Sequence, residues 1–319
     1  MHLLIGTDEA GYGPNLGPLV VAASAWQVPQ KVGPAELYDH LQEFVTLESG
    51  KHETRLAIAD SKALYSPGGG LAAIECGVLS CLTLLGERPT STVALWNALA
   101  AHCHSDRASL AWHNAEEEAL PIDACSTRVG DFSGALASGL KRLKVELKSL
   151  RAAAVFPGRF NAEVEQHENK ATVLSLVTLE LIKDLLDDLR DLPVIVTCDK
   201  HGGRDRYAHL IQHVFGDDPV RVVRESKNES VYRLDIARRP IELQFISKGE
   251  RMLPAALASM TAKYLREISL RPFNRFWQQH VPGLKPTAGY PNDARRFKAE
   301  ILTVQQQLGI EDRVLWRCR

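Results

Sequence analysis

The chain opens with two β-prone apolar runs joined by a short turn rich in glycine and proline. Residues 2–8 are largely apolar up to an acidic pair, Asp8 and Glu9, and residues 19–28 are β-prone again. The turn between them, residues 11–18, contains three glycines and two prolines. Two strand patterns separated by such a turn predict an antiparallel hairpin, with Asp8 at the C-terminal end of its first strand.

The rest of the chain mixes helical and strand patterns, which indicates an α/β protein. The clearest helix covers 168–190, where apolar residues recur on one broad face. Residues 193–198 form an apolar run typical of a central strand covered on both faces, and Asp199 follows it directly. The remaining expected strands are 219–224, 231–236 and 241–247, and the remaining expected helices are 35–48, 71–85, 204–215, 254–268, 270–280 and one from about 292.

Residues 86–150 are less regular than the rest of the chain. They combine a β-like stretch at 92–95 with helical pieces and polar loops, and we interpret them as an elaboration on the core. No internal repeat or low-complexity linker divides the sequence. We therefore expect a single catalytic domain over residues 1–319, with a helical C-terminal part from about residue 268.

Composition and charge are those of an ordinary globular protein, with 45% hydrophobic and 24% charged residues. The formal net charge of −1 excludes a chain that attracts nucleic acid through its overall charge. From residue 251 to residue 319, however, 12 Lys and Arg stand against 5 Asp and Glu. This local excess predicts either a face that meets phosphates or a solvated helical surface.

The six cysteines form no C-x-x-C pair, so we expect free thiols in a reducing compartment. A zinc site can be drawn from Cys103, His104, His113 and Cys125, although their spacing fits no finger pattern. Neither a secretory signal nor an apolar run close to the ~20 residues of a membrane span is visible. We expect a cytoplasmic protein that makes no membrane contact, and we favour a monomer.

Acidic residues follow three of the predicted strands: Asp8 with Glu9, then Asp199, then Glu250. A single Asp after a strand is commonly a helix cap or a turn residue. Several carboxylates at the ends of neighbouring strands would repel one another unless cations neutralise them. Oxygen ligands without His or Cys suit Mg²⁺ or Mn²⁺. Two such ions about 4 Å apart activate water and stabilise the leaving oxygen in phosphodiester hydrolysis.

One long motif resembles a known family. Residues 6–21 read G-T-D-E-A-G-Y-G-P-N-L-G-P-L-V-V, which resembles the opening of ribonucleases HII and HIII, the type 2 ribonuclease H family. The resemblance covers most of the chain except about 86–150 and the extreme C-terminus. Further blocks in that family's order are A-D-S-K-A-L at 59–64, V-T-C-D at 196–199, and K-G-E at 248–250 with Ala258, Ser259, Ala262 and Lys263 behind it, with looser matches at 169–172 and 289–291.

The resemblance implies a ribonuclease H-like fold, a mixed five-stranded sheet flanked by helices, with insertions. It also implies an endonuclease that hydrolyses the RNA strand of RNA–DNA hybrids, or cuts duplexes containing ribonucleotides, and leaves 5′-phosphate ends. The cofactor would be Mg²⁺ or Mn²⁺, two ions per site. The residues that the resemblance assigns as catalytic metal ligands are Asp8, Glu9, Asp199 and Glu250, and a Glu in the last place is similar to ribonuclease HIII.

Five residues correspond to substrate contacts of the family: Gly11, Tyr12, Gly13, Lys62 and Tyr290. Glycines let backbone N–H groups approach a phosphate and a 2′-hydroxyl, although a tight hairpin turn also requires them. The family has Arg or Thr where this chain has Tyr12, so the choice between a single embedded ribonucleotide and a longer RNA stretch stays open. Lys62 is expected near the phosphate that is cut, and Tyr290 either beside the ribonucleotide sugar or in the core.

Two alternative functions remain. One is a nuclease of the same fold that acts on another nucleic-acid structure, and the other is a non-catalytic nucleic-acid-binding protein. The presence of all four carboxylates argues against the second alternative, because an acidic cluster without cations is costly.

Overall fold

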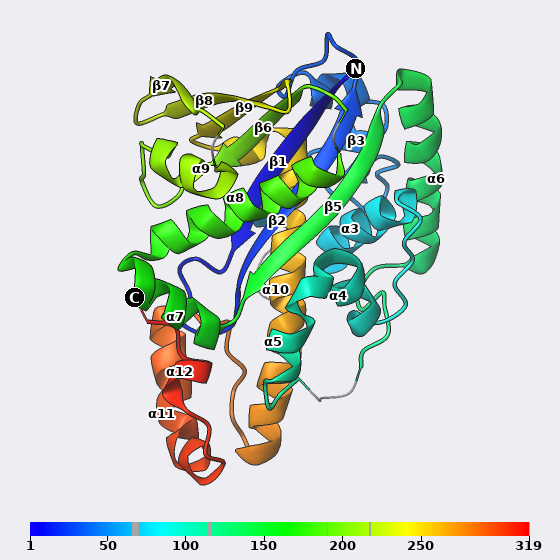
Figure 1. Ribbon diagram of the computed structural model, residues 1–319. Helices are drawn as coiled ribbons and strands as arrows, with labels where there is room; N and C mark the ends of the chain where they lie inside the picture. Colours follow the sequence, from blue (N-terminus) through cyan, green and yellow to red (C-terminus); the bar gives the residue numbers. More distant parts are fainter. Residues whose placement is uncertain (66–69, 114–116, 190, 217, 319) are drawn as a thin grey trace.

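A seven-stranded mixed sheet forms the centre of the computed structural model, which describes residues 1–65, 70–113, 117–189, 191–216 and 218–318. The strand order is β5-β2-β1-β6-β9-β8-β7, and helices cover both faces (Figure 1). The predicted α/β class, a mixed sheet flanked by helices, is confirmed, whereas the expected number of five strands is wrong. The strands are β1 (His2–Ala10), β2 (Leu19–Val28), β5 (Glu146–Val155), β6 (Val194–Asp199), β7 (Arg221–Glu225), β8 (Glu229–Ile236) and β9 (Arg239–Ile246).

The middle of the sheet brings three parallel strands to one edge. β1 and β2 form the predicted antiparallel hairpin. On its other side β1 pairs in parallel with β6, with Thr7 opposite Cys198, and β6 pairs in parallel with β9. Because parallel strands end at the same edge, the segments that follow β1, β6 and β9 are neighbours in space.

The strand that the sequence did not predict, β5, lies at one edge of the sheet. β5 pairs with β2, although its sequence contains three consecutive alanines that do not favour a strand. At the other edge, β8 and β7 extend the sheet beyond β9 as the sequence predicts. The β-like stretch at 92–95 is instead part of a helix, α4 (Thr92–Ala100), whose N-terminus is capped by Ser91 Oγ accepting from Ala94 N at 3.2 Å.

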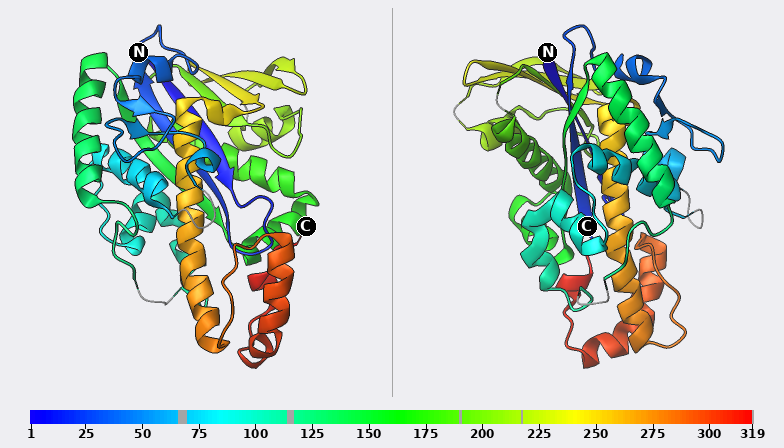
Figure 2. Two further views of the ribbon diagram at one scale, coloured as in Figure 1. Left: turned by 180° about the vertical axis from the view of Figure 1, so that it is seen from behind. Right: turned by 90° about the vertical axis from the view of Figure 1, so that its right-hand side faces the viewer.

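Two helical layers enclose the sheet (Figures 1 and 2). Successive residues of β1 alternate between them: Leu3 and Ile5 pack with α7, α8 and α9, whereas Leu4 packs with α3, α4, α6 and α10. The helices are α1 (Leu37–Leu41), α2 (Ser61–Leu64), α3 (Ala72–Leu84), α4, α5 (His104–Ala108), α6 (Ser126–Leu143), α7 (Pro157–His167), α8 (Lys170–Asp188), α9 (Ala208–Phe215), α10 (Leu253–His280), α11 (Pro291–Gln307) and α12 (Asp312–Leu315). The short elements are β3 (Val45–Thr46), β4 (Leu56–Ala57) and the 3₁₀ turns η1 (Ala101–Cys103) and η2 (Gly249–Arg251).

Helix α10 crosses the back of β1 at very short range. A Cβ atom on Gly6 would lie only 2.0 Å from Ala255 N, so glycine at this position lets the helix backbone touch the strand. Two separate helices were expected here, but α10 continues through Pro272. Pro272 lacks the N–H group for one backbone hydrogen bond of the helix. The burial of Ile268, Phe273 and Trp277 on both sides of it stabilises the continuous helix by more than the loss of that bond costs.

The C-terminal segment returns to the glycine turn after β1. Arg317 N donates to Asn15 O at 2.8 Å, and Asn15 Nδ2 donates to Arg317 O at 3.3 Å. Asn161 of α7 holds the same segment by donating to Trp316 O at 2.8 Å. The start and the end of the chain thus form one structural unit beside the ends of the parallel strands.

Several expectations about cysteines and membranes have clear outcomes in the described part of the chain. All six cysteines are free, as expected. The drawn zinc group does not form, because no three described His, Cys, Asp or Glu side chains stand together as metal ligands, and Cys103 is buried against Ala154 of β5. None of the helices in this part combines the length and the apolar character that crossing a bilayer requires.

Candidate active site

The predicted acidic residues gather where the parallel strands end. Asp8 and Glu9 lie just before the last residue of β1, Ala10. Asp199 is the final residue of the adjacent strand β6. Glu250 follows β9 in η2. Asp8 and Asp199 are roughly 190 residues apart in the sequence, and Asp199 and Glu250 roughly 50. The pairing of β1 with β6 and of β6 with β9 brings these segments to one edge of the sheet.

Backbone geometry ties two of these acids together. Lys248, at a left-handed φ of 67°, turns the chain after β9 back over the end of β6. In this turn Lys248 N and Gly249 N donate to Asp199 Oδ1 at 3.0 and 3.3 Å. The K-G-E segment therefore fixes the Asp199 carboxylate, and the charge of Glu250, which follows directly, acts on Lys62.

The electrostatics of the acidic group are unfavourable without cations. Burial raises the pKa of Asp8, and the charges of Asp199 and Asp60 raise it further, while a hydrogen bond from Ser259 opposes them. The pKa of Glu9 is raised by burial and by the charges of Asp8 and Asp199, and lowered by Lys62. These carboxylates are thus held where their charged forms are penalised.

Divalent cations fit this donor set, which consists of carboxylate oxygens without sulfur or imidazole. As arranged here, the described side chains do not form a group of three acids at metal-binding separation. The arrangement fixes Asp199 through its backbone partners and leaves Glu250 on a short 3₁₀ turn.

The D-S-K block lies next to the acids and is fastened to α10. Asp60 caps α2 by accepting from Lys62 N at 3.2 Å, and Ser259 Oγ donates to Asp60 Oδ1 at 3.3 Å. Asp60 therefore orients this segment. Although burial opposes the charge on Lys62, the carboxylates Asp60, Asp8, Glu250 and Asp199 raise the pKa of Lys62.

The two glycines that flank Tyr12 differ in whether the fold requires glycine at that position. Gly11 has a left-handed φ of +91°, and a Cβ there would lie 2.5 Å from Pro18 O and 2.8 Å from Arg266 Nε. Gly13 has no such backbone requirement, and a Cβ there would meet nothing within 4 Å. The fold accounts for Gly11, whereas the small size of Gly13 leaves an exposed backbone open to a ligand.

Tyr12 is largely occupied by contacts within the protein. Lys170 Nζ lies 4.5 Å from the centre of its ring, and the ring packs against the core on the α8 side. Its hydroxyl approaches the loop after β6, since a Cβ on Gly202 would lie 2.8 Å from Tyr12 Oη. Tyr12 therefore braces the start of α8 and this loop while one side lines the pocket described next.

A pocket of about 400 Å³, here called the turn pocket, is lined by all five predicted substrate-contact residues. Tyr290 lines it and is 52% exposed, which excludes the alternative of a core tyrosine. Its walls come from residues 9–14 of the glycine turn, from Ser61, Lys62 and Tyr65, from Lys263, Arg266 and Glu267 of α10, and from Ala288 and Tyr290.

The turn pocket also contains residues that sequence reasoning missed. Tyr65 Oη donates to Glu267 Oε2 at 3.1 Å, and Lys263 Nζ lies 4.2 Å from the centre of the Tyr65 ring. The spacing of Lys263, Arg266 and Glu267 on one helical face, within the basic C-terminal quarter, was the available signal. Only the fold shows that this face meets the glycine turn.

The basic loop after Asp199 has a structural role. Lys200 Nζ is nearly enclosed and donates to Asp205 Oδ1, Ser226 O and Ser230 Oγ. Arg204 donates to Thr172 Oγ1 at 2.8 Å. Both side chains are therefore engaged in contacts within the protein.

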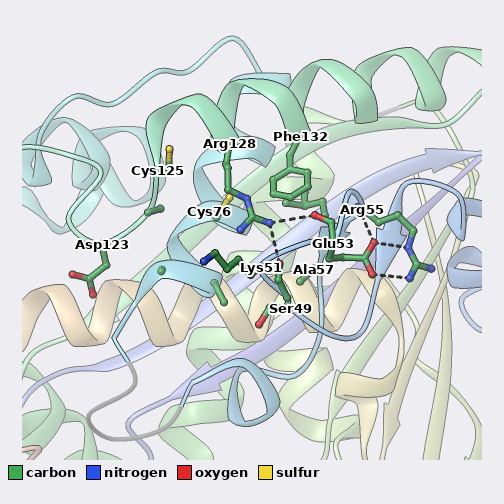
Figure 3. A pocket seen from close by; sticks show the side chains of 15 residues that line it. Ser49, Lys51, Glu53, Arg55, Ala57, Cys76, Asp123, Cys125, Arg128 and Phe132 are labelled. Carbon is green, nitrogen blue, oxygen red and sulfur yellow. Dashed lines mark hydrogen bonds and ion pairs between the residues drawn. The ribbon is translucent and has the colours of Figure 1, made fainter.

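A separate hollow lies between α6, α3 and the loop before β4 (Figure 3). It includes none of the predicted site residues, and its main cations are engaged. Arg55 pairs with Glu53 at 2.8 Å, and Arg128 donates to the backbone oxygens of Gly50 and Glu53. The turn pocket, next to the acids, is accordingly the candidate active site.

Comparison with known proteins gives matches among solved structures. Neither a protein-family model nor a curated protein sequence matches the chain. The chain is similar to the ribonuclease HII of Archaeoglobus fulgidus, solved with PCNA, at 16% identity and a TM-score of 0.45 over 99% of this chain and 94% of that one. The ribonuclease H2 of Pyrococcus horikoshii aligns at 15% identity and a TM-score of 0.44, over 98% and 92%. Bst-RNase HIII in complex with Mn²⁺ aligns at 14% and 0.45, over 99% and 66%.

Proposed function

We propose that this chain is a divergent type 2 ribonuclease H, an endonuclease that hydrolyses the RNA strand of RNA–DNA hybrids. The observation that carries the proposal is that β1, β6 and β9, which carry Asp8, Glu9 and Asp199 and lead into Glu250, end at one edge of the sheet, beside a pocket lined by Gly11, Gly13, Lys62 and Tyr290. These residues come from five separate parts of the sequence, so we treat the whole chain as one catalytic unit.

The four carboxylates would hold two Mg²⁺ or Mn²⁺ ions. When bound, such ions neutralise the acids and lower the pKa of water so that it can attack phosphorus. The residues of the chain supply the remaining functions. Lys62, the cation beside the acids, binds the phosphate that is cut, and the exposed backbone at Gly13 approaches the ribose 2′-hydroxyl. Hydrolysis leaves a 3′-hydroxyl and a 5′-phosphate.

The choice of substrate is tested by one cleavage experiment. The protein is incubated with Mg²⁺ or Mn²⁺ and with three labelled duplexes: an RNA–DNA hybrid, a DNA duplex with one ribonucleotide, and plain DNA. We expect cleavage of the hybrid within its RNA strand and none of plain DNA. Cleavage of plain DNA alone contradicts the proposal and supports a nuclease for another nucleic-acid structure. Binding without cleavage of any duplex supports a non-catalytic binding protein.

Tyr12 bears on the form of RNA that is cut. Because its ring and hydroxyl face Lys170 and Gly202, it does not supply a charge to the strand as an Arg would. We infer that the long hybrid is cut faster than the duplex with one ribonucleotide. Recognition of a lone ribonucleotide lacks the charged contact to the strand that an Arg at this position would make. Equal rates on both substrates would contradict this inference.

A further inference from the structure

Two cysteines line the hollow between α6, α3 and the loop before β4, which contains none of the predicted site residues (Figure 3). Cys76 lies in α3, and Cys125 is the residue directly before α6. Cys125 is exposed and Cys76 is partly buried, whereas Cys81, Cys103 and Cys198 are buried. The cavity has a volume of about 440 Å³, so a small molecule that enters it meets both cysteines.

Backbone hydrogen bonds hold the segment before Cys125 against α3. Glu75, which precedes Cys76 in the sequence, accepts from Asp123 N and Ala124 N at 2.7 Å each. Cys125 follows Ala124 directly. The two cysteines are thus the next residues along the chain from a pair of short hydrogen bonds that join α3 to the start of α6.

The surroundings of Cys125 favour its thiolate form. The backbone N–H groups of Arg128 and Thr127, in the first turn of α6, lower the pKa of the Cys125 thiol, and the charge of Arg128 lowers it further. The Arg128 guanidinium donates to Gly50 O and Glu53 O at 3.2 and 3.3 Å. Because these partners are neutral carbonyl groups, the positive charge of Arg128 remains available to the thiolate. A thiolate at a helix N-terminus beside a guanidinium is the reactive form of cysteine.

Cys76 has the opposite character. Burial raises the pKa of the Cys76 thiol, and the neighbouring Cys125 raises it further. Cys76 therefore stays protonated in the reduced protein, while the exposed Cys125 is the nucleophile. An accessible thiolate next to a shielded thiol is the arrangement of an attacking and a resolving cysteine.

We propose that Cys125 and Cys76 form a site of thiol–disulfide exchange, which takes a low-molecular-weight disulfide as its oxidant. The thiolate of Cys125 attacks one sulfur of that disulfide, whose S–S bond breaks and releases one thiol. Cys76 then gives up its proton and attacks the Cys125 sulfur of the mixed disulfide, which releases the second thiol. The two cysteines are oxidised to one intramolecular disulfide and the oxidant is reduced to two thiols, which carry the two protons that the cysteines lost.

The disulfide joins α3 to the start of α6 and closes the chain between residues 76 and 125. It restricts the unfolded chain, whereas the folded chain already holds these segments together through Glu75. In a reducing compartment a disulfide of this kind is transient and responds to the redox state. The site is independent of the proposed nuclease function.

The test treats the full chain with oxidised glutathione near neutral pH. The remaining thiols are then alkylated, and the peptides are mapped by mass spectrometry. We expect a peptide pair linked through Cys76 and Cys125. We also expect the melting temperature of the oxidised chain to exceed that of the reduced chain by at least about 2 °C, and excess dithiothreitol to reverse both changes.

Single substitutions separate the two steps. With Cys76→Ser we expect glutathione to remain attached to Cys125, without a rise in melting temperature. Cys125→Ser should leave Cys76 reduced, because the attacking thiolate is missing. The matched control is Cys318→Ser: Cys318 is also exposed but does not line the hollow, so the link between Cys76 and Cys125 should form as before.

Melting temperatures of the reduced variants report whether they fold, and Cys76→Ala and Cys125→Ala provide a second pair of substitutions. The proposal is overturned if Cys125 of the unsubstituted chain stays a free thiol, or if it retains glutathione without forming the link to Cys76. A rise in melting temperature that persists with Cys76→Ser also overturns it. No nucleic acid enters this experiment, so its outcome is separate from that of the cleavage experiment.

Discussion

The amide nitrogen of Lys248 lies 3.0 Å from Asp199 Oδ1, so the turn after β9 donates to the carboxylate at the end of β6. This hydrogen bond links two of the strands that carry the predicted catalytic acids. It holds one oxygen of Asp199 against the backbone and leaves the other available. The position of Glu250, two residues after Lys248, depends on the same turn.

Asp199→Asn should abolish most activity while preserving this turn. Asparagine keeps an oxygen that accepts from Lys248 N, but it lacks the charge that a divalent cation needs. We expect the rate of hybrid cleavage to fall by at least ~100-fold, with a melting temperature close to that of the unsubstituted chain. The control is Asp235→Asn, an exposed acid on β8 at the opposite end of the sheet. Unchanged cleavage by Asp199→Asn would refute the assignment.

Stability without metal should fall as the pH rises. Burial and neighbouring charges raise the pKa values of Asp8 and Glu9 in the folded state, so the folded protein holds their protons more tightly than the unfolded chain. The contribution of these acids is therefore most favourable below about pH 4, their ordinary pKa range, and is lost as the pH rises towards neutrality. Urea unfolding in EDTA at several pH values measures this loss, and the double variant Asp8→Asn, Glu9→Gln should show a smaller one.

Mg²⁺ or Mn²⁺ should reverse the penalty at neutral pH and above. Cations that bind the folded state alone stabilise it, and we expect a rise in melting temperature of at least about 2 °C at saturating metal. The double variant Asp8→Asn, Glu9→Gln should show no such rise, while Asp235→Asn should behave like the unsubstituted chain. A metal-induced rise that persists in the double variant places the binding site elsewhere.

The two turn glycines should separate stability from substrate binding. Gly11→Ala places a Cβ against Pro18 O and Arg266 at a left-handed φ, and should lower the free energy of unfolding by about 2 kcal/mol. Gly13→Ala meets no neighbour and should leave the melting temperature nearly unchanged. Since we propose that the Gly13 backbone contacts the substrate, Gly13→Ala should raise the KM for the hybrid although the protein remains stable. A KM equal to that of the unsubstituted chain would argue against this contact.

A buried carboxylate outside the active site should matter for stability alone. Glu75 is fully buried and accepts from the backbone nitrogens of Ile122, Asp123 and Ala124, each at 2.7 Å, and from Tyr264 Oη at 2.5 Å. Glu75→Gln should reduce the free energy of unfolding by about 1–3 kcal/mol, because its amide cannot accept from all these donors. Tyr264→Phe removes one of these bonds and should cost about 1 kcal/mol. Chemical denaturation measures both, and a Glu75→Gln protein as stable as the unsubstituted chain would contradict the backbone anchoring.

Local patterns were sufficient where neighbouring residues decide the structure. The hairpin of β1 and β2, the central strand β6 and the helix α8 follow from apolar periodicity and from the turn residues between them. Residues 92–95 and 146–155 were misjudged for different reasons. In the first case the Ser91 cap favours a helix, and in the second an alanine-rich segment becomes the strand β5 because β2 offers it a partner.

The candidate site divides in the same way. The sequence alone determined the identity of Asp8, Glu9, Asp199 and Glu250, their places at strand ends, and the glycine turn that follows the first pair. Only the tertiary structure decided that the turn meets Lys263 and Arg266 of α10, that Arg317 returns to the carbonyls of Gly11 and Pro14, and that Tyr12 faces Lys170. The physical reason is range: strand ends follow from neighbouring residues, whereas these contacts join segments up to about 300 residues apart, which pack together only once the sheet and α10 are in place.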